Sequence, residues 1–232
     1  MDFLLVPGAG GDASYWMSLV PLLEAEGHRA VAVTLPAGDA GAGLAEYADA
    51  IVDAGAQLRR ITMVAQSMGG FSAPLAVGRL DVAQLVLLNA MIPMHGETFG
   101  DWWVTTGQGQ AAAEAAAAAG RDPAAPFDPV EDFFHDVPAT VRDEIFARGE
   151  PAQADRPLSE PWPLKAWPEV ETRVVVGADD RLFPPEFQRR VARERLGLDV
   201  TVLPGGHLIA LAHPAELTQH LIETASVHAA RL

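Results

Sequence analysis

The amino-acid sequence predicts an α/β fold in which a mostly parallel, six-stranded sheet is covered by helices on both faces. Three observations predict it. Short apolar runs alternate along the chain with longer segments whose apolar residues have helical spacing. The short runs are apolar throughout, as in strands that are buried on both faces. Most runs end at glycine, proline or a polar residue, which is typical of a loop.

Six segments are predicted to be strands because each is short, apolar or rich in β-branched residues, and bounded by loop-forming residues. They are Phe3–Val6, Arg29–Leu35, Ile61–Ala65, Leu85–Leu88, Thr172–Val176 and Val200–Leu203. Five segments between or after them repeat apolar residues at intervals of three and four, which predicts helices. These are Ala13–Glu26, Leu44–Leu58, Met68–Leu80, Pro184–Leu196 and Pro214–Ala229. The alternation of strands and helices predicts parallel strands.

The alternation breaks in residues 91–163, where no segment is a strand candidate. Two stretches there are predicted to be helical, Gln110–Ala119 and Ala139–Ala147. Large aromatic side chains in this region need a surface against which they can be buried, which favours a folded helical insertion. A mobile loop is the alternative. We therefore predict a core of residues 1–90 and 164–232 and a helical insertion of residues 91–163.

Composition excludes several classes of protein. The 232 residues include 31 acidic and 16 basic side chains, for a formal charge of −15, and 49% of them are hydrophobic. This apolar fraction is too high for a disordered chain. The negative charge argues against a nucleic-acid partner, because phosphate binding needs clustered Lys and Arg. The absence of cysteine excludes disulfides, thiolate metal sites and a cysteine nucleophile.

The sequence also predicts that the protein has no membrane partner. The first eight residues lack the basic leader and the long apolar run of a secretory signal. No segment approaches the roughly 18 consecutive apolar residues that a membrane helix needs. We therefore expect a soluble, cytoplasmic protein that acts on a small molecule. The sequence is compatible with a homo-oligomer.

Polar or flexible residues follow four of the predicted strands, in residues 7–11, 65–70, 177–180 and 204–207. Sites in such sheets lie at the carboxyl ends of the strands. In the second loop, Ser67 lies between a strand and a helix, with Ala65 and Gly69 two positions away on either side. This pattern is typical of a nucleophile elbow, a tight turn that exposes a reactive serine. The alternative is an ordinary turn in which Ser67 caps the helix.

The order of the polar residues favours the elbow. A serine becomes a good nucleophile when a histidine takes its proton and a carboxylate orients that histidine. Here Ser67 is followed by Asp180 and then His207, each in its own loop, and this is the order that a strand-to-helix elbow requires. Asp179 competes with Asp180 for the third role, and we favour Asp180. The alternative for His207 is a solvated loop histidine.

With these motifs the chain resembles the α/β-hydrolase superfamily, and in particular its compact members similar to plant methylesterases and hydroxynitrile lyases. The resemblance is carried by residues 4–11 with Tyr15-Trp16, by residues 65–70, by residues 177–184 and by residues 205–207. It spans nearly the whole chain, which would begin at the third strand of larger members. One departure is Pro7-Gly8, where members usually carry His-Gly, and it puts the geometry of this first loop in question.

The resemblance implies an α/β-hydrolase fold with Ser67, Asp180 and His207 as catalytic residues. It implies an oxyanion hole made by the backbone N–H groups of Ala9 and Met68, and it makes residues 91–163 a cap over the site. Within or beside this cap, the candidate substrate-binding residues are Trp102, Trp103, His95 and Met91. Arg181 is expected to brace the two acids. No cofactor and no metal ion is expected, and the pocket should favour an uncharged, largely apolar group.

The leading hypothesis is a serine hydrolase that cleaves a small, largely apolar carboxylic ester or thioester through an acyl-enzyme. One alternative is a lyase, or another cofactor-free enzyme, that uses the same residues for acid–base chemistry. Lyases of that kind typically have an additional lysine in the cap, and Lys165 is the only lysine between Asn89 and Thr172. The second alternative is a receptor-like member that binds a ligand without turnover.

Overall fold

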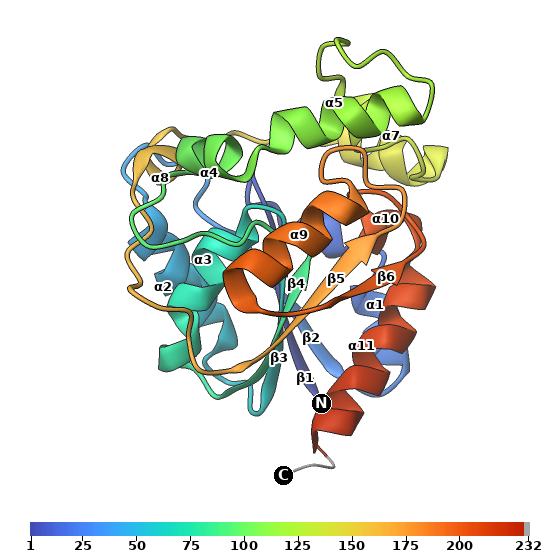
Figure 1. Ribbon diagram of the computed structural model, residues 1–232. Coiled ribbons are helices and arrows are strands. Elements are labelled where there is room, and N and C mark those ends of the chain that lie inside the picture. Colours follow the sequence, from blue (N-terminus) through green and yellow to red (C-terminus); the bar gives the residue numbers. More distant parts are fainter. Residues whose placement is uncertain (230–232) are drawn as a thin grey trace.

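The computed structural model describes residues 1–229 and contains one six-stranded sheet with the strand order β2-β1-β3-β4-β5-β6 (Figure 1). All neighbouring strands are parallel. The strands are β1 (Asp2–Val6), β2 (Arg29–Ala32), β3 (Ile61–Gln66), β4 (Val82–Leu88), β5 (Glu171–Gly177) and β6 (Val200–Leu203). The prediction of an α/β fold with a six-stranded parallel sheet is therefore confirmed.

Helices cover both faces of this sheet, because successive residues of a strand point to opposite sides. In β1, Leu4 and Val6 belong to one buried cluster, whereas Phe3 and Leu5 belong to another. The first cluster includes side chains of α2 (Leu44–Gly55), α3 (Gly69–Ala76) and α9 (Pro185–Leu196). The second includes side chains of the 3₁₀ helix η1 (Ala13–Trp16) and of α1 (Val20–Ala25), α10 (Ile209–Ala212) and α11 (Pro214–Ala229). None of the helices in residues 1–229 is long and apolar enough to cross a membrane.

Two predicted elements near the amino terminus are shorter in the structure. The helix expected over Ala13–Glu26 is divided into η1 and α1, and Pro21 lies in the first turn of α1. Proline lacks an N–H and fits the first turn of a helix better than its interior, so it marks a new helix start. The strand expected over Arg29–Leu35 ends at Ala32, where pairing with β1 stops.

Two predicted helices end early. The helix expected over Leu44–Leu58 ends at Gly55. The helix expected over Met68–Leu80 ends at Ala76 and continues as the 3₁₀ helix η2 (Val77–Arg79). Glycine is a poor residue for a helix interior, which is consistent with the first of these two ends.

The helices between β4 and β5 lie over the edge of the sheet where the strands end (Figure 1). They are α4 (Phe99–Thr106), α5 (Gln108–Ala118), α6 (Pro129–Asp132), α7 (Ala139–Ala147) and α8 (Arg156–Ser159). We call residues 91–163 the cap segment, and their treatment as a separate unit stays a prediction. Trp102 and Trp162 of this segment belong to the same buried cluster as Leu4 and Val6. The cap segment is therefore packed on the core.

Helix α4 was not predicted from the apolar pattern, although its start has a recognisable signal. The Thr98 hydroxyl accepts a hydrogen bond from the Asp101 N–H (3.1 Å), and the Asp101 carboxylate accepts one from the Thr98 N–H (3.0 Å). This reciprocal arrangement is a capping box, which satisfies two of the free N–H groups at a helix start. The motif Thr-x-x-Asp was therefore the sequence signal for α4.

Candidate active site

Ser67 lies in a strained turn between β3 and α3. Its φ is 51°, a left-handed conformation that non-glycine residues rarely adopt. A Cβ on Gly70 would lie 1.8 Å from the carbonyl oxygen of Met91, and one on Gly69 would lie 2.9 Å from that of Pro7. Both positions therefore require glycine. The helix cap is Met68, with no side-chain cap bond, so Ser67 does not cap α3 and is free for other contacts.

His207 connects Ser67 with Asp180. Its Nε2 lies 3.0 Å from the Ser67 Oγ, and its Nδ1 lies 2.9 Å from the Asp180 Oδ2. The His207 and Asp180 residues are only 1% and 3% exposed. Asp179 is exposed, and its carbonyl oxygen lies 3.1 Å from the His135 Nε2. The structure thus brings Ser67, His207 and Asp180 into one hydrogen-bonded series and leaves the Asp179 carboxylate outside it.

The Asp180 carboxylate is held by several donors besides His207. Its Oδ1 accepts hydrogen bonds from the backbone N–H groups of Leu182 (2.9 Å) and Phe183 (2.8 Å). Its Oδ2 lies 3.3 Å from the amide nitrogen of Gln188 in α9. A buried carboxylate is costly unless it is hydrogen-bonded, and these donors satisfy it and fix its orientation toward His207.

Asn89, which directly follows β4 and was not predicted as a site residue, ties the loops of the site together. It is buried and has a positive φ of 44°. Its amide nitrogen donates to the carbonyl oxygens of Gly206 (3.0 Å) and His207 (3.1 Å). Its amide oxygen accepts from the Gly177 N–H (2.8 Å). A polar residue directly after a central apolar strand was the signal for this role.

The cap segment contacts His207 and its loop directly. The Phe133 ring is stacked on the His207 ring, with 5.0 Å between centroids and an angle of 20°. On another side, the Phe183 ring packs edge-on against it at 5.1 Å. The Asp136 Oδ2 accepts a hydrogen bond from the Gly206 N–H (2.6 Å). The imidazole is therefore enclosed by two aromatic rings, one from the cap segment and one from the loop after β5.

The loop after β1 makes a tight turn in which the Gly11 N–H donates to the Gly8 carbonyl oxygen (3.1 Å), and Gly10 has a φ of +80°. A positive φ at the third residue is typical of a type II turn. Within residues 1–229, neither the Ala9 N–H nor the Met68 N–H has a hydrogen-bond partner, and both residues line the cavity beside Ser67. These two donors are therefore available to a ligand at Ser67.

Gln153 of the cap segment holds this turn. Its Oε1 accepts a hydrogen bond from the Gly10 N–H (2.9 Å), and its Nε2 donates to the Tyr47 hydroxyl (3.1 Å). The departure at Pro7 raised a question about the geometry of this loop. In the structure the loop is ordered by its own turn and by Gln153.

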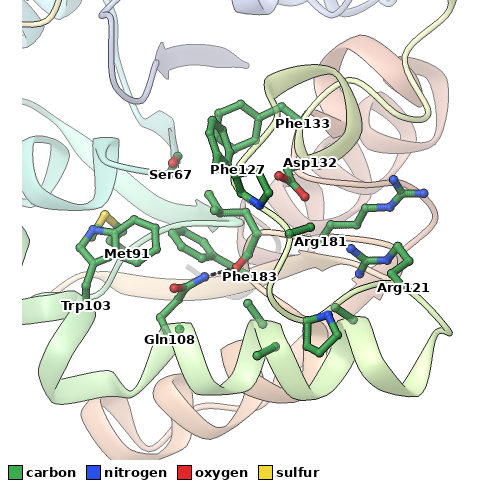
Figure 2. A pocket seen from close by; sticks show the side chains of 18 of the residues that line it. Ser67, Met91, Trp103, Gln108, Arg121, Phe127, Asp132, Phe133, Arg181 and Phe183 are labelled. Atoms are coloured by element: carbon green, nitrogen blue, oxygen red, sulfur yellow. Dashed lines mark hydrogen bonds between the residues drawn. The ribbon is translucent and has the colours of Figure 1, made fainter.

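Two cavities open at Ser67. The first, which we call the α5 cavity, has a volume of about 640 Å³ and extends along α5 (Figure 2). Met91 and Trp103 line it near Ser67, and their predicted role in substrate binding stays a prediction. Arg121 and Arg181 lie toward the other end of this cavity. The α5 cavity is therefore apolar beside the serine and charged far from it.

The second cavity, which we call the α7 cavity, has a volume of about 710 Å³ and is lined by Ile145 and Phe146 of α7. His207 lines this cavity and not the α5 cavity. Tyr15 also lines it, and burial raises the pKa of the Tyr15 phenol well above its ordinary value of 10.0. The phenol is therefore neutral at physiological pH.

Two of the four predicted substrate-binding residues lie elsewhere. Trp102 lines neither cavity, is 1% exposed and donates from its Nε1 to the Ile92 carbonyl oxygen (3.2 Å). It packs the cap segment on the core, because a large aromatic side chain with a satisfied N–H is suited to a buried position. His95 is exposed and also lines neither cavity. Both assignments are corrected.

The expected role of Arg181 is also corrected. Its Nη1 donates to the Glu131 carbonyl oxygen (2.7 Å) and lies 3.1 Å from the Glu131 carboxylate. It therefore binds the cap segment and does not brace Asp179 and Asp180. The acids have other partners, since backbone N–H groups and Gln188 hold the Asp180 carboxylate.

A hydrogen-bonded serine–histidine–aspartate series at the carboxyl edge of a parallel sheet, under a helical segment, defines the class of the site. A sequence model of the alpha/beta hydrolase family matches residues 3–220. The chain belongs to this family.

Individual relatives agree with this assignment. The chain is 36% identical over 110 residues to the probable esterase PIR7A of Oryza sativa subsp. indica, a match that spans 42% of each protein. The fold is similar to that of a pyrethroid hydrolase from Sphingobium faniae JZ-2 (TM-score 0.69, 22% identity, 97% of each chain). It is also similar to that of a methylesterase from Arabidopsis (TM-score 0.74, 20% identity, 98% of this chain and 99% of that one).

Proposed function

We propose that the protein is a serine hydrolase that cleaves a largely apolar carboxylic ester through an acyl-enzyme. The observation that carries the proposal is the geometry of His207, with Nε2 at 3.0 Å from the Ser67 Oγ and Nδ1 at 2.9 Å from the Asp180 Oδ2. The family and the names of its relatives, which include a probable esterase and a methylesterase, support the same class of reaction.

In the proposed reaction, His207 Nε2 takes the proton of the Ser67 Oγ as the oxygen bonds to the ester carbonyl carbon. The negative carbonyl oxygen of the tetrahedral intermediate accepts hydrogen bonds from the free N–H groups of Ala9 and Met68. One such donor is worth about 3 kcal/mol in the transition state. Asp180 holds the imidazole in the required tautomer and stabilises the imidazolium.

The intermediate collapses as the carbon–oxygen bond to the alcohol breaks and His207 Nε2 gives its proton to the departing oxygen. A water molecule then attacks the acyl-enzyme, with His207 as base, and releases the acid and the free Ser67 hydroxyl. Protons balance over the cycle, because each one that His207 takes is given back.

Neither alternative is favoured by an observation of its own. A lyase of this kind would need a lysine from the cap at the site, but Lys165 is exposed and lines neither cavity. The receptor hypothesis has no need for a Ser67 hydroxyl in hydrogen-bond contact with His207. Accumulation of an acyl-enzyme on Ser67, observed by mass spectrometry, would separate ester hydrolysis from both.

The test is labelling by a fluorophosphonate together with turnover of a short nitrophenyl ester. We expect the probe to label Ser67, and Ser67→Ala to lose labelling and at least about 10⁴-fold of kcat, because no nucleophile remains. Ser226→Ala is the control, since this exposed serine of α11 bonds to the Ile222 carbonyl oxygen and lines neither cavity. Folded protein that neither reacts with the probe nor turns over the ester would refute the proposal.

A further inference from the structure

The α5 and α7 cavities meet at Ser67, so a molecule that reacts there can extend into both. The two cavities share Ala9, Ser67, Phe127 and Phe133 as lining residues. The Phe127 and Phe133 rings are in contact, with 5.0 Å between their centroids. They form an aromatic partition between the two cavities beside the serine.

The cavities differ in their relation to His207. His207 lines the α7 cavity only, whereas Met68, one of the two free N–H donors, lines the α5 cavity only. This difference matters because the departing oxygen of an ester must receive its proton from the histidine that took it from the serine. The alcohol side of the substrate must therefore lie on the side of His207.

Resting on the function proposed above, we infer that the α7 cavity holds the alcohol part of the ester and the α5 cavity holds the acyl part. On breakage of the carbon–oxygen bond, His207 Nε2 protonates the alcohol oxygen, and the alcohol leaves through the α7 cavity. The acyl group stays on the Ser67 Oγ, in contact with Met91 and Trp103 of the α5 cavity.

The lining of the cavities indicates the chemical class of each part. Volumes of about 640 and 710 Å³ are each within the range that binds a whole small molecule. The α7 cavity presents Phe134, Ile145 and Leu211, and the α5 cavity presents Trp103, Phe183 and the small side chains of α5. These side chains are apolar, so the substrate is an ester with an aryl or alkyl group on each side of the carbonyl. The charged residues Arg121 and Arg181 lie at the far end of the α5 cavity.

Two substitutions narrow the cavities separately. Ala113 of α5 lines the α5 cavity, and Ala113→Phe would fill part of that cavity. The matched control is Ala117→Phe, because Ala117 lies on the same helix, is exposed and lines neither cavity. Ile145→Trp would narrow the α7 cavity, with Ala147→Trp as the control at the exposed end of α7.

The substrates are the four esters that combine acetic or hydrocinnamic acid with methanol or benzyl alcohol. We expect Ala113→Phe to lower kcat/KM for both hydrocinnamates by roughly tenfold or more and to spare both acetates. We expect Ile145→Trp to lower kcat/KM for both benzyl esters by a similar factor and to spare both methyl esters. Ile145→Trp should also leave the hydrolysis rate of a preformed acyl-enzyme unchanged, because the alcohol has already left the α7 cavity.

Three results would overturn the inference: the opposite pattern of effects, an equal loss of kcat/KM for all four esters, or no loss of kcat/KM in either variant. Fluorophosphonate labelling of Ser67 in each variant separates this failure from failure of the proposed function. An enzyme that is labelled and hydrolyses methyl acetate, yet lacks the expected pattern, refutes only the orientation. An unlabelled, inactive parent enzyme refutes the proposed function and the orientation with it.

Discussion

Backbone strain is concentrated at the candidate site. Among residues 1–229, three non-glycine residues have a positive φ, and two of them, Ser67 and Asn89, belong to the site. Each such conformation costs about 1–3 kcal/mol and persists only where the surrounding structure holds it. Around Ser67 the backbone is held by the Met91 N–H, which donates to the Ser67 carbonyl oxygen at 3.0 Å. The strain exposes the hydroxyl while the backbone stays fixed.

The hydrogen bond from the Gly10 N–H to Gln153 predicts that this side chain supports catalysis. Gln153→Met keeps the size of the side chain but removes the acceptor for the Gly10 N–H, so the turn that presents the Ala9 N–H loses a restraint. We expect kcat to fall by roughly tenfold with little change in KM, because an oxyanion donor acts mainly in the transition state. Steady-state kinetics and the inhibition constant of a trifluoromethyl ketone would measure this.

The control is Gln219→Met, an exposed glutamine of α11 that bonds only to Glu223. Gln153→Glu, which retains an oxygen that can accept from Gly10, should recover part of the affinity for the ketone. A higher KM with unchanged kcat would show that Gln153 acts on substrate binding and not on the oxyanion loop.

At the scale of elements, the short segment around α6 joins the cap segment to the catalytic loops. Its Phe133 is stacked on His207, its His135 contacts the loop of Asp179, and its Asp136 accepts the Gly206 N–H. A Cβ on Gly206 would lie 2.6 Å from the His135 Nε2, so a larger residue there would displace the His135 side chain. The position of His207 thus depends on both the core and the cap segment.

Asp136→Ala tests this dependence. Without the carboxylate, the Gly206 N–H loses its acceptor and the loop of His207 is less restrained. We expect the rate of fluorophosphonate labelling of Ser67 to fall by roughly tenfold, because small displacements of a catalytic group are costly. Asp143→Ala is the control, since Asp143 is exposed and its carboxylate pairs only with Arg142. A lower melting temperature with an unchanged labelling rate would assign Asp136 a purely structural role.

In the molecule as a whole, largely buried contacts also join the cap segment to the core outside the lining of the two cavities. Arg195 of α9 donates to the Glu97 carboxylate, which lies before α4, with Nη2 to Oε1 at 2.8 Å. The two side chains are 7% and 12% exposed. Burial by itself would raise the pKa of Glu97, but hydrogen bonds from Arg195, from the Thr105 hydroxyl and from the Met94 N–H outweigh it and lower that pKa below its ordinary value of 4.5.

This shift predicts a dependence of stability on pH. A carboxyl group with a lowered pKa in the folded protein contributes its full stabilisation above its unfolded pKa of 4.5 and loses it as the pH falls through the folded pKa. We expect Glu97→Gln to lower the free energy of unfolding by about 2 kcal/mol at neutral pH, and by less in strong acid. Urea denaturation at several pH values would measure the difference.

Glu194→Gln is the matched control, because this exposed residue of α9 forms a surface pair with Arg190, and such pairs contribute within about 1 kcal/mol. If the free energies of unfolding of Glu97→Gln and the parent differed by the same amount from neutral to acidic pH, the argument from the lowered pKa of Glu97 would be contradicted.

The features that could be predicted from the sequence are local. Apolar runs and helical spacing predicted the strands and most helices of the core, since a strand or helix follows largely from the residues within it. The motif at residues 65–70 and the chain order of Ser67, Asp180 and His207 predicted the candidate site. Gly69 and Gly70 beside Ser67 marked positions where a side chain would clash with backbone atoms, and Gly205 marked one with a positive φ.

Which groups meet at the site became clear from the folded structure alone. It placed Asp180 and not Asp179 on His207, removed Trp102 and His95 from the lining of the cavities, and brought Gln153 and Asp136 to the catalytic loops. The physical reason is that these contacts join residues far apart along the chain. Hydrogen bonds and packing between distant segments are fixed by how the sheet and the cap segment come together, and this leaves no periodic pattern in the sequence.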